Sequence, residues 1–358
     1  TGQLQGGGYG MAVHEALVGT YTRRDAEGIY NARFDSDTGR FEVTGLAAEL
    51  PNPSYLAQSG EFIYAVLEEK YGLVTALRRD GAQLTELNRK PTLGAHPCHL
   101  SVVDGQIGVA NYSSGSVSLY CRAEDGSLGD LCSVERHAGH GPNKRRQSGP
   151  HAHMAYPDPW ASSLLVPDLG CDRLYRYSLQ QGALELEGFT QMAAGSGPRH
   201  VIAHPTLRGV YYVVNELDNT IARLAPDADH RLTVNETVSA LPSNFKGQSA
   251  TAALRIHPTG NHLYATNRGA DCIVCVGLGN DGSFGPCTFA PSGGEHPRDL
   301  VLDPTGQWLL VANQDSDSLR VYALNSGVPA GGGTDVAVPV PVCVLFVDSA
   351  EVKQERTA

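Results

Sequence analysis

A short segment recurs along the chain at a spacing that few folds allow. In each copy a proline or small residue precedes a short apolar run, as in HPCHLSVV from His96, GPRHVIAH from Gly197 and HPRDLVLD from His296. One aligned column through the six complete copies holds Tyr55, His99, His153, His200, Leu254 and Asp299. Neighbouring members of this column lie 44 to 54 residues apart, and two further apolar runs follow each copy. A period of about 50 residues with about four short strands is typical of the blades of a β-propeller.

The seventh copy is split between the two ends of the chain. ALVGTYTRRDAEGIYNARFD from Ala16 matches the second and third strands of a blade, and VPVCVLFVD from Val340 matches the first. The sequence therefore predicts an all-β fold, a seven-bladed β-propeller of four-stranded antiparallel blades, whose ring is closed by a C-terminal strand pairing with the N-terminal blade. One domain is expected over residues 15–348, with a surface loop at Gly327–Thr334 and a frayed tail at 349–358.

Charge and hydropathy limit the partners of such a chain. The formal net charge is -11, which disfavours a general surface for nucleic acid or an acidic membrane. An anionic small molecule can bind only at a local cluster of cations. No apolar run approaches the ~20 residues of a membrane helix. Residues 1–14, expected to be a flexible leader or a remnant of expression, lack the regions of a secretory signal. We therefore expect a cytoplasmic protein that is a monomer or a weak homo-oligomer.

Eight cysteines are dispersed along the chain, at positions 98, 121, 132, 171, 272, 275, 287 and 343. In a long chain this dispersal favours reduced thiols, most of them buried in strands. Cys272 and Cys275 form a CxxC spacing inside the apolar run CIVCV. A structural zinc site needs a second ligand pair, and none is placed convincingly, so these two are expected to be core residues.

The topology of a blade predicts where polar side chains meet. In a four-stranded up-and-down blade, the loop that enters the first strand and the loop that follows the second lie at the same end. A polar residue ends the second strand of every blade: Tyr21, Glu68, Tyr112, Asp168, Glu216, Arg268 and Gln314. This column is expected to surround one mouth of the central channel, together with the segments that enter the first strands.

Three arginines, Arg199, Arg268 and Arg298, are expected at this mouth. Like charges held together are unfavourable unless anions neutralise them. Carboxylates such as Glu216 and Asp168 could do so in a network that braces the blades. Guanidinium forks also suit the oxygens of a bound carboxylate or phosphate. The sequence favours an anion site and leaves the bracing network open.

Histidines supply the candidate acids and bases. His151 and His153 lie two residues apart at one strand entrance, which puts them on one side of an extended chain. Each can transfer a proton near neutral pH, and His200 shares the column of His153. Imidazoles beside carboxylates could also bind a metal, but no specific ligand pattern is present, so no metal and no cofactor is predicted. The basic insertion that contains Lys144–Arg146 either guards the mouth or is a solvated loop.

Several motifs together resemble the lactonase family of seven-bladed propellers, which includes the propeller-type 6-phosphogluconolactonases and the fungal carboxymuconate-lactonizing enzymes. The motifs are GTYT, GPNKRRQSGPHAH, GPRHVIAHP, VVNELDNT, RIHPTGNHLYATNRG and HPRDLVLDPTGQWLLVANQDSDSL. The resemblance covers roughly residues 15 to 348. It implies metal-independent chemistry on a lactone or its acid. The family's presumed site residues fall on His151 with His153 beside it, Arg199, Glu216, Arg268 and Arg298.

The leading hypothesis is a lactonase that hydrolyses a sugar lactone, with 6-phosphogluconolactone, giving 6-phosphogluconate, as the best guess. The expected catalytic residues are His151, Glu216, Arg199 and Arg268. The expected substrate-binding residues are His153, His200, Arg298 and Asp168. Two alternatives stay open: a cycloisomerase that forms a muconolactone from carboxy-cis,cis-muconate, and a non-enzymatic propeller that only binds ligands.

Overall fold

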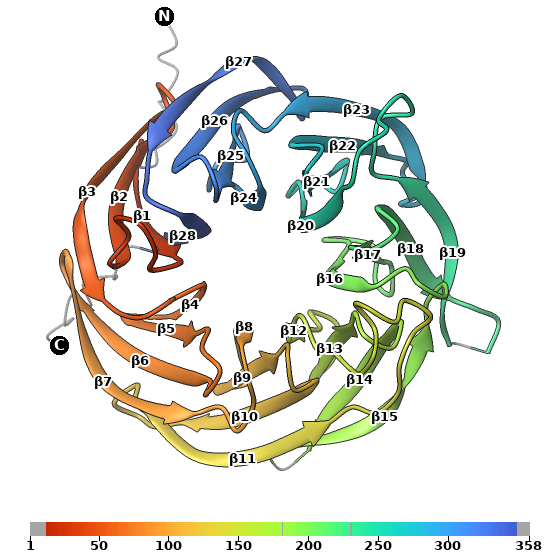
Figure 1. Ribbon diagram of the computed structural model, residues 1–358, viewed down its shortest axis with the longest axis horizontal. Helices are drawn as coiled ribbons and strands as arrows, with labels where there is room; N and C mark the ends of the chain where they lie inside the picture. The colour runs from red at the N-terminus through yellow and green to blue at the C-terminus, as the bar shows by residue number, and fades with distance from the viewer. Residues whose placement is uncertain (1–11, 181, 230, 349–358) are drawn as a thin grey trace, which may run out of the picture.

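Seven β-sheets are arranged in a ring around a central axis in the computed structural model, which describes residues 12–180, 182–229 and 231–348 (Figure 1). Each sheet has four antiparallel strands, so the predicted seven-bladed propeller is confirmed. The described residues form no helix long and apolar enough to cross a membrane. Residues 1–11 and the predicted tail at 349–358 lie outside the described part. The first strand begins at Val13, within the expected leader at 1–14.

Each blade runs from an innermost strand near the central axis to an outermost strand at the rim (Figure 1). Blade 1 contains β28 (Pro341–Val347), β1 (Val13–Thr20), β2 (Gly28–Asp35) and β3 (Arg40–Glu49). Blade 2 contains β4 (Tyr55–Ser59), β5 (Phe62–Leu67), β6 (Leu73–Asp80) and β7 (Gln83–Pro91). Blade 3 contains β8 (Pro97–Val103), β9 (Gln106–Asn111), β10 (Ser116–Arg122) and β11 (Leu128–Arg136). Blade 4 contains β12 (Tyr156–Pro157), β13 (Ser163–Asp168), β14 (Arg173–Gln180) and β15 (Ala183–Gln191).

The last three blades follow the same pattern. Blade 5 contains β16 (Pro198–Ala203), β17 (Tyr211–Asn215), β18 (Thr220–Pro226) and β19 (Leu232–Ser239). Blade 6 contains β20 (Ala250–Ile256), β21 (His262–Arg268), β22 (Cys272–Leu278) and β23 (Phe284–Pro291). Blade 7 contains β24 (Pro297–Leu302), β25 (Trp308–Asn313), β26 (Ser318–Asn325) and β27 (Val328–Ala337).

The hydrophobic core lies between neighbouring blades and not within any one of them. One cluster joins Tyr64 of blade 2 to Leu100 and Val109 of blade 3, and another joins Tyr212 of blade 5 to Leu263 of blade 6. Both faces of a middle strand are therefore covered. All five residues of β17 are buried, for example, which accounts for the weak alternation of polar and apolar residues in the sequence.

The C-terminal strand closes the ring, as the split repeat predicts. β28 pairs antiparallel with β1, with Ala16 opposite Phe346. A buried ion pair strengthens the closure: the Asp299 carboxylate lies 3.0 Å from Arg255 Nη2 and accepts the Val344 backbone N–H at 3.1 Å. The closing strand is thus tied to blades 6 and 7 through one side chain.

Replacing Asp299 with alanine should destabilise the closed ring. The change leaves the Arg255 guanidinium without its carboxylate and the Val344 N–H without its acceptor, and the loss of one partner of a buried ion pair costs about 3 kcal/mol or more. Urea denaturation measures the free energy of unfolding. The matched control is Asp335→Ala, which breaks the exposed pair with Arg320 and should cost no more than about 1 kcal/mol. Equal effects of the two substitutions would contradict the proposed role of Asp299 in closure.

The prediction of a surface loop at Gly327–Thr334 is wrong, because this segment forms most of β27. Asn325 pairs with Val328 and Val321 with Thr334 across the hairpin of β26 and β27. An outermost strand packs few side chains on its exposed face, so glycines weaken it less there than they would in an inner strand.

The cysteine prediction holds for six residues and is wrong for two. Cys98, Cys171, Cys272, Cys275 and Cys343 are buried free thiols, and Cys287 is a half-buried one. Cys121 and Cys132, however, form a disulfide between β10 and β11. Dispersal along the sequence was a poor guide because a hairpin brings residues 11 apart close together, here with the two Cα atoms at 6.2 Å.

A recurring backbone hydrogen bond gathers the polar residues at one end of the ring. The Glu68 N–H donates to the Asn52 carbonyl at 3.0 Å, and the Glu216 N–H donates to the Gly197 carbonyl at 2.7 Å. Equivalent bonds run from Tyr112 to His96, from Leu169 to His151 and from Gln314 to His296. Each bond joins the loop after a second strand to the loop that enters the first strand, so both loops lie at the same mouth, as predicted.

The entrance to β16 needs a glycine. Gly197 has φ 64°, in the left-handed region, and a Cβ atom there would lie 2.5 Å from the Leu217 side chain. This turn directs the chain through Pro198 into Arg199, the next residue of the strand.

Candidate active site

The Glu216 carboxylate is the centre of the site. It follows the last residue of β17, and its side chain is only 4% exposed. Oε2 lies 3.1 Å from Arg199 Nε of blade 5 and 2.8 Å from Arg268 Nη2 of blade 6. Oε1 lies 2.6 Å from Arg146 Nη2, which comes from the loop leading into blade 4. One carboxylate therefore pairs with three guanidinium groups from three separate segments.

These arginines fix the protonation of Glu216. Burial by itself would raise the pKa of this carboxyl, but Arg268, Arg199, His153 and Arg146 outweigh burial and hold the pKa well below its ordinary value. Glu216 is therefore ionised at neutral pH and has little affinity for a proton. Its chemical role is to hold the guanidinium groups in place, since a good general base needs a pKa nearer the working pH.

Backbone carbonyls hold two of the arginines as well. Arg199 Nη1 donates to the Ala252 carbonyl at 2.7 Å and to His200 Nε2 at 3.1 Å. Arg268 Nη2 donates to the Thr251 carbonyl at 3.0 Å. Burial, with repulsion from Arg268 and Arg298, lowers the pKa of Arg199 to about 9, so this guanidinium is charged at neutral pH. Donors fixed in this way need little reorganisation to stabilise negative charge.

Arg298 joins the cluster through a second carboxylate. Its Nη2 lies 3.6 Å from Glu68 Oε2, and its guanidinium stacks over the Tyr21 ring at 5.0 Å. The Tyr21 hydroxyl donates to the same Glu68 oxygen at 2.8 Å. The four arginines at positions 146, 199, 268 and 298 thus face the two carboxylates of Glu68 and Glu216, which leaves an excess of two positive charges.

His151 offers a free basic nitrogen beside this cluster. Its Nδ1 lies 3.0 Å from the Tyr112 carbonyl oxygen. Because a carbonyl only accepts, Nδ1 carries the proton and the neutral ring has its lone pair on Nε2. Nε2 makes no hydrogen bond with any described residue. The ring stacks on Tyr112 with centroids 4.5 Å apart, and the Tyr112 hydroxyl accepts a bond from Arg146 at 3.2 Å. Tyr112 therefore links His151 to the arginines.

Asp168 holds the loop that carries His151. The side chain is fully buried, and Oδ1 accepts the backbone N–H groups of His151 at 2.8 Å, Gly170 at 2.9 Å and Cys171 at 3.2 Å. Oδ2 accepts from His137 Nδ1 at 2.5 Å. The structure therefore does not bring Asp168 to the guanidinium groups, because Asp168 is the last residue of β13 and lies one residue before Leu169, whose backbone bond to His151 is equivalent to that of Glu216. Its place fits a positioning residue better than the substrate-binding role expected from the sequence.

His153, His200 and His99 form a cluster next to Arg199, which His200 contacts. All three are buried, with His200 5.6 Å from His153 and 6.0 Å from His99 between ring centroids. Burial, with the charge of Arg199, lowers the pKa of His153 and of His200 well below the ordinary value, so both rings are neutral. A cavity of about 10 Å³, room for about one water molecule, lies beside Arg199, His200 and Arg298.

Two residues of the site were not predicted from the sequence. Arg146 was left undecided between the mouth and a solvated loop, although the length and charge of its insertion were a signal. Arg255, which pairs with Asp299, gave no signal because it lies near the end of an apolar strand, outside the aligned positions that were considered.

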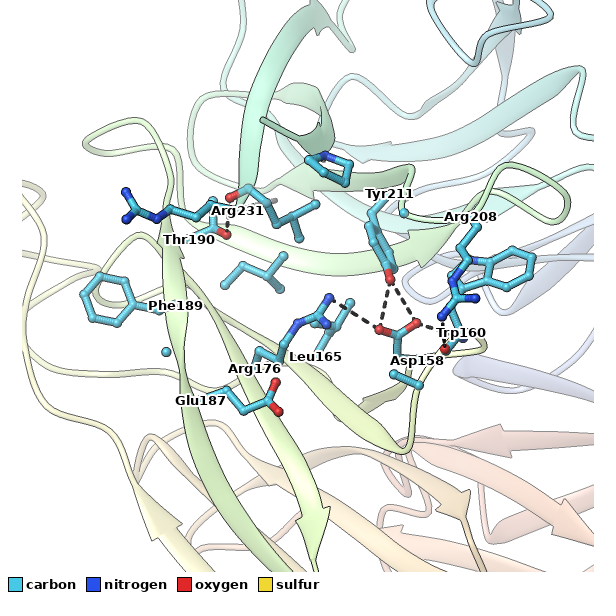
Figure 2. A pocket seen from close by; sticks show the side chains of 16 residues that line it. Asp158, Trp160, Leu165, Arg176, Glu187, Phe189, Thr190, Arg208, Tyr211 and Arg231 are labelled. Atoms are coloured by element: carbon cyan, nitrogen blue, oxygen red, sulfur yellow. Dashed lines mark hydrogen bonds and ion pairs between the residues drawn. The ribbon is translucent and has the colours of Figure 1, made fainter. Parts of the chain in front are cut away.

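Other parts of the described structure do not compete for the chemistry. A groove of about 610 Å³ lies between blades 4 and 5, along β14, β15 and the loops that join the first and second strands, and none of the four clustered arginines lines it (Figure 2). Its buried carboxylate, Asp158, is already satisfied by the Tyr211 hydroxyl at 2.9 Å and by Arg176 at 3.4 Å. Among the residues that the structure describes, no group of three or more His, Cys, Asp or Glu side chains is arranged to share a metal ion.

Comparison with known proteins decides the family. The sequence model described as "Lactonase, 7-bladed beta-propeller" matches residues 15–346. The chain belongs to this lactonase family. A relative from Bacillus subtilis (strain 168), named 6-phosphogluconolactonase, is 34% identical over 349 residues, which cover 94% of this chain and 99% of the relative.

Solved structures of similar proteins share the whole lactonase propeller. A periplasmic gluconolactonase of Pseudomonas aeruginosa is 30% identical, with a TM-score of 0.88 over 94% of this chain and 99% of that one. A protein from Lactobacillus plantarum is 32% identical, with a TM-score of 0.89 over 94% of this chain and 100% of that one. The resemblance inferred from the motifs is therefore confirmed along nearly the full length of the lactonase.

Proposed function

We propose that the protein hydrolyses a sugar lactone and that its substrate is 6-phosphogluconolactone, which it converts to 6-phosphogluconate. One observation carries this proposal: a cluster with two excess positive charges lies beside a histidine whose Nε2 is free. The names of the Bacillus subtilis relative and of the Pseudomonas aeruginosa structure support it.

The geometry suggests how water opens the lactone ring. Arg199 and Arg268 receive the ester carbonyl oxygen, and His151 Nε2 takes a proton from a water molecule as its oxygen attacks the carbonyl carbon. The guanidinium groups stabilise the oxyanion that forms. Collapse of this intermediate breaks the bond between the carbonyl carbon and the ring oxygen, and His151 returns the proton to the leaving alkoxide. The products are the free hydroxyl and the carboxylic acid, which ionises to the carboxylate with release of one proton, and one water is consumed.

The remaining residues support this chemistry without transferring protons. Glu216 holds the three arginines, since its lowered pKa makes it a poor acid or base. His153 and His200 are neutral and pack behind Arg199, and Arg298 adds charge for an anionic substrate. Asp168 fixes the His151 loop.

A panel of three substrates tests the proposed activity. Purified protein is given 6-phosphogluconolactone, glucono-1,5-lactone and carboxy-cis,cis-muconate. Acid release follows the lactones, after correction for spontaneous hydrolysis, and loss of ultraviolet absorbance follows the muconate. Release of acid from the phosphorylated lactone supports the proposal. Turnover of the muconate alone would identify a cycloisomerase, and binding without turnover of any compound would identify a non-enzymatic propeller.

The proposal places the protein in the cytoplasm, as a monomer or weak homo-oligomer. The net charge of -11 disfavours nucleic acid as a partner. The alternative is an oxidising compartment, which would agree with the Cys121–Cys132 disulfide and with the likeness to a periplasmic protein. Fractionation of cells with thiol alkylation separates the two: reduced Cys121 in the cytoplasmic fraction supports the proposal, and an intact disulfide in a fraction outside the cytoplasm overturns it.

A further inference from the structure

We infer that Arg146 selects phosphorylated over unphosphorylated lactones by binding the phosphate group of the substrate. The inference deepens the proposed function and rests on it. It assigns the basic insertion a purpose: to add one guanidinium that blades 5, 6 and 7 do not supply.

The insertion is a rigid, anchored loop. Gln147 is fully buried, and its Nε2 donates to Asp172 Oδ1 at 2.8 Å and to the Leu169 carbonyl at 2.9 Å. Its backbone carbonyl accepts the Gly141 N–H at 3.0 Å, and its Oε1 accepts the Asn143 N–H at 3.1 Å, which closes the loop on itself. Arg146 is therefore held in place by its immediate neighbour.

The same anchor ties the insertion to the segment that carries Arg199. The Asp172 carboxylate, which binds Gln147, also accepts the backbone N–H of Gly195 at 2.7 Å and of Gly197 at 2.8 Å. Gly197 begins the turn into Arg199. One buried carboxylate thus fixes the position of Arg146 relative to the catalytic arginines, which is what a specificity residue requires.

The guanidinium of Arg146 is only partly engaged. Nη2 binds both Glu216 Oε1 and the Tyr112 hydroxyl, whereas Nη1 and Nε make no hydrogen bond within the described ranges of the chain. The side chain is 38% exposed, in contrast to 3% for Arg199 and 11% for Arg268. Arg146 therefore keeps free donors at the rim of the cluster.

The chemistry of the substrate matches this contrast between the partly exposed Arg146 and the buried Arg199 and Arg268. In 6-phosphogluconolactone the phosphate is carried by the exocyclic carbon, several bonds away from the reacting carbonyl. If the carbonyl reaches the buried Arg199 and Arg268, the phosphate needs a cation nearer the solvent. A guanidinium with free donors suits a phosphate, whose oxygens accept several hydrogen bonds.

The test compares selectivity between two lactones. kcat/KM is measured for 6-phosphogluconolactone and for glucono-1,5-lactone with the wild type, Arg146→Gln and the control Arg145→Gln. Arg145 is the same residue type in the same loop and is exposed. Loss of charge-assisted hydrogen bonds to phosphate should lower kcat/KM for the phosphorylated lactone by about 100-fold in Arg146→Gln. The loss for the unphosphorylated lactone should be about 5-fold or less, because the neutral substrate meets only the altered Glu216 pair. Arg145→Gln should keep the selectivity of the wild type.

Equal losses for both lactones in Arg146→Gln would overturn the inference, since Arg146 would then act only through Glu216.

Calorimetric binding of 6-phosphogluconate and gluconate supplies a readout without turnover. A protein that hydrolyses neither lactone, yet prefers 6-phosphogluconate in a manner that needs Arg146, would refute the proposed function and leave the anion selection standing. No preference for 6-phosphogluconate in the wild type would refute the selection itself. Arg146→Lys should restore part of the preference, as a point charge without the fork.

Discussion

Replacing Arg199 with alanine lowers kcat for lactone hydrolysis by about 100-fold or more, with a smaller change in KM, because a fixed donor to an oxyanion contributes mainly in the transition state. The guanidinium is buried and held by the Ala252 carbonyl, His200 and Glu216. Truncation thus removes a donor whose orientation has already been set by the fold. Steady-state kinetics at saturating substrate measures the effect.

Two comparisons separate this role from simple loss of structure. Arg199→Lys keeps the charge but cannot reach Ala252, His200 and Glu216 at once, so kcat should still fall by about 10-fold. Thermal unfolding of both variants shows whether the propeller remains intact. A rise in KM with an unchanged kcat would contradict the assignment, because it would mean that Arg199 binds substrate and transition state equally.

Replacing His151 with asparagine removes the proposed general base, and kcat should fall by about 100-fold or more. The amide side chain of asparagine cannot take a proton from water, whereas the arginines remain in place. The experiment measures kcat for the variant and then adds free imidazole, which should restore part of the activity. His140→Asn changes an exposed histidine of the same insertion and should leave kcat within about 2-fold of the wild type.

The outcome that excludes this role is a His151→Asn variant with wild-type kcat. A loss of activity without rescue by imidazole, combined with a lower melting temperature, would show instead that the ring acts through its stacking on Tyr112.

The fold was predictable because the repeat recurs in every blade. Aligned columns such as His153 and His200 fix the blade period, and the split copy fixes how β28 closes the ring beside β1. The errors arose where pairing along a hairpin, invisible to a repeat alignment, decided the structure. Cys121 and Cys132 meet across β10 and β11, and the Gly-rich segment pairs with β26 as the outermost strand.

The site was predictable in outline and not in its division of roles. Topology brings Arg199, Glu216 and Arg268 to one mouth, as their places in the repeat require. The same column cannot show which way a side chain turns. The alignment was also one residue out of register in blade 4: Leu169 makes the backbone bond equivalent to that of Glu216, whereas Asp168 is the last residue of β13 and binds backbone N–H groups and His137. Arg146 lies in an insertion without counterparts in other blades, so its contact with Glu216 follows only from the three-dimensional path of that loop.

The protonation of Glu216 also depends on the assembled site. From the sequence alone, a carboxylate at a strand end is equally compatible with the role of a base, an acid or an ion-pair partner. Three guanidinium groups within 3.1 Å decide among these, because together they stabilise the ionised form against the cost of burial.

The most direct test of the arginine cluster as the catalytic centre is a crystal structure with 6-phosphogluconate bound. The product carboxylate should lie within hydrogen-bond distance of Arg199 and Arg268, with the former ring oxygen near His151 Nε2 and the phosphate at Arg146. A product molecule seated in the groove between blades 4 and 5, with no product oxygen near the arginine cluster, would contradict the account.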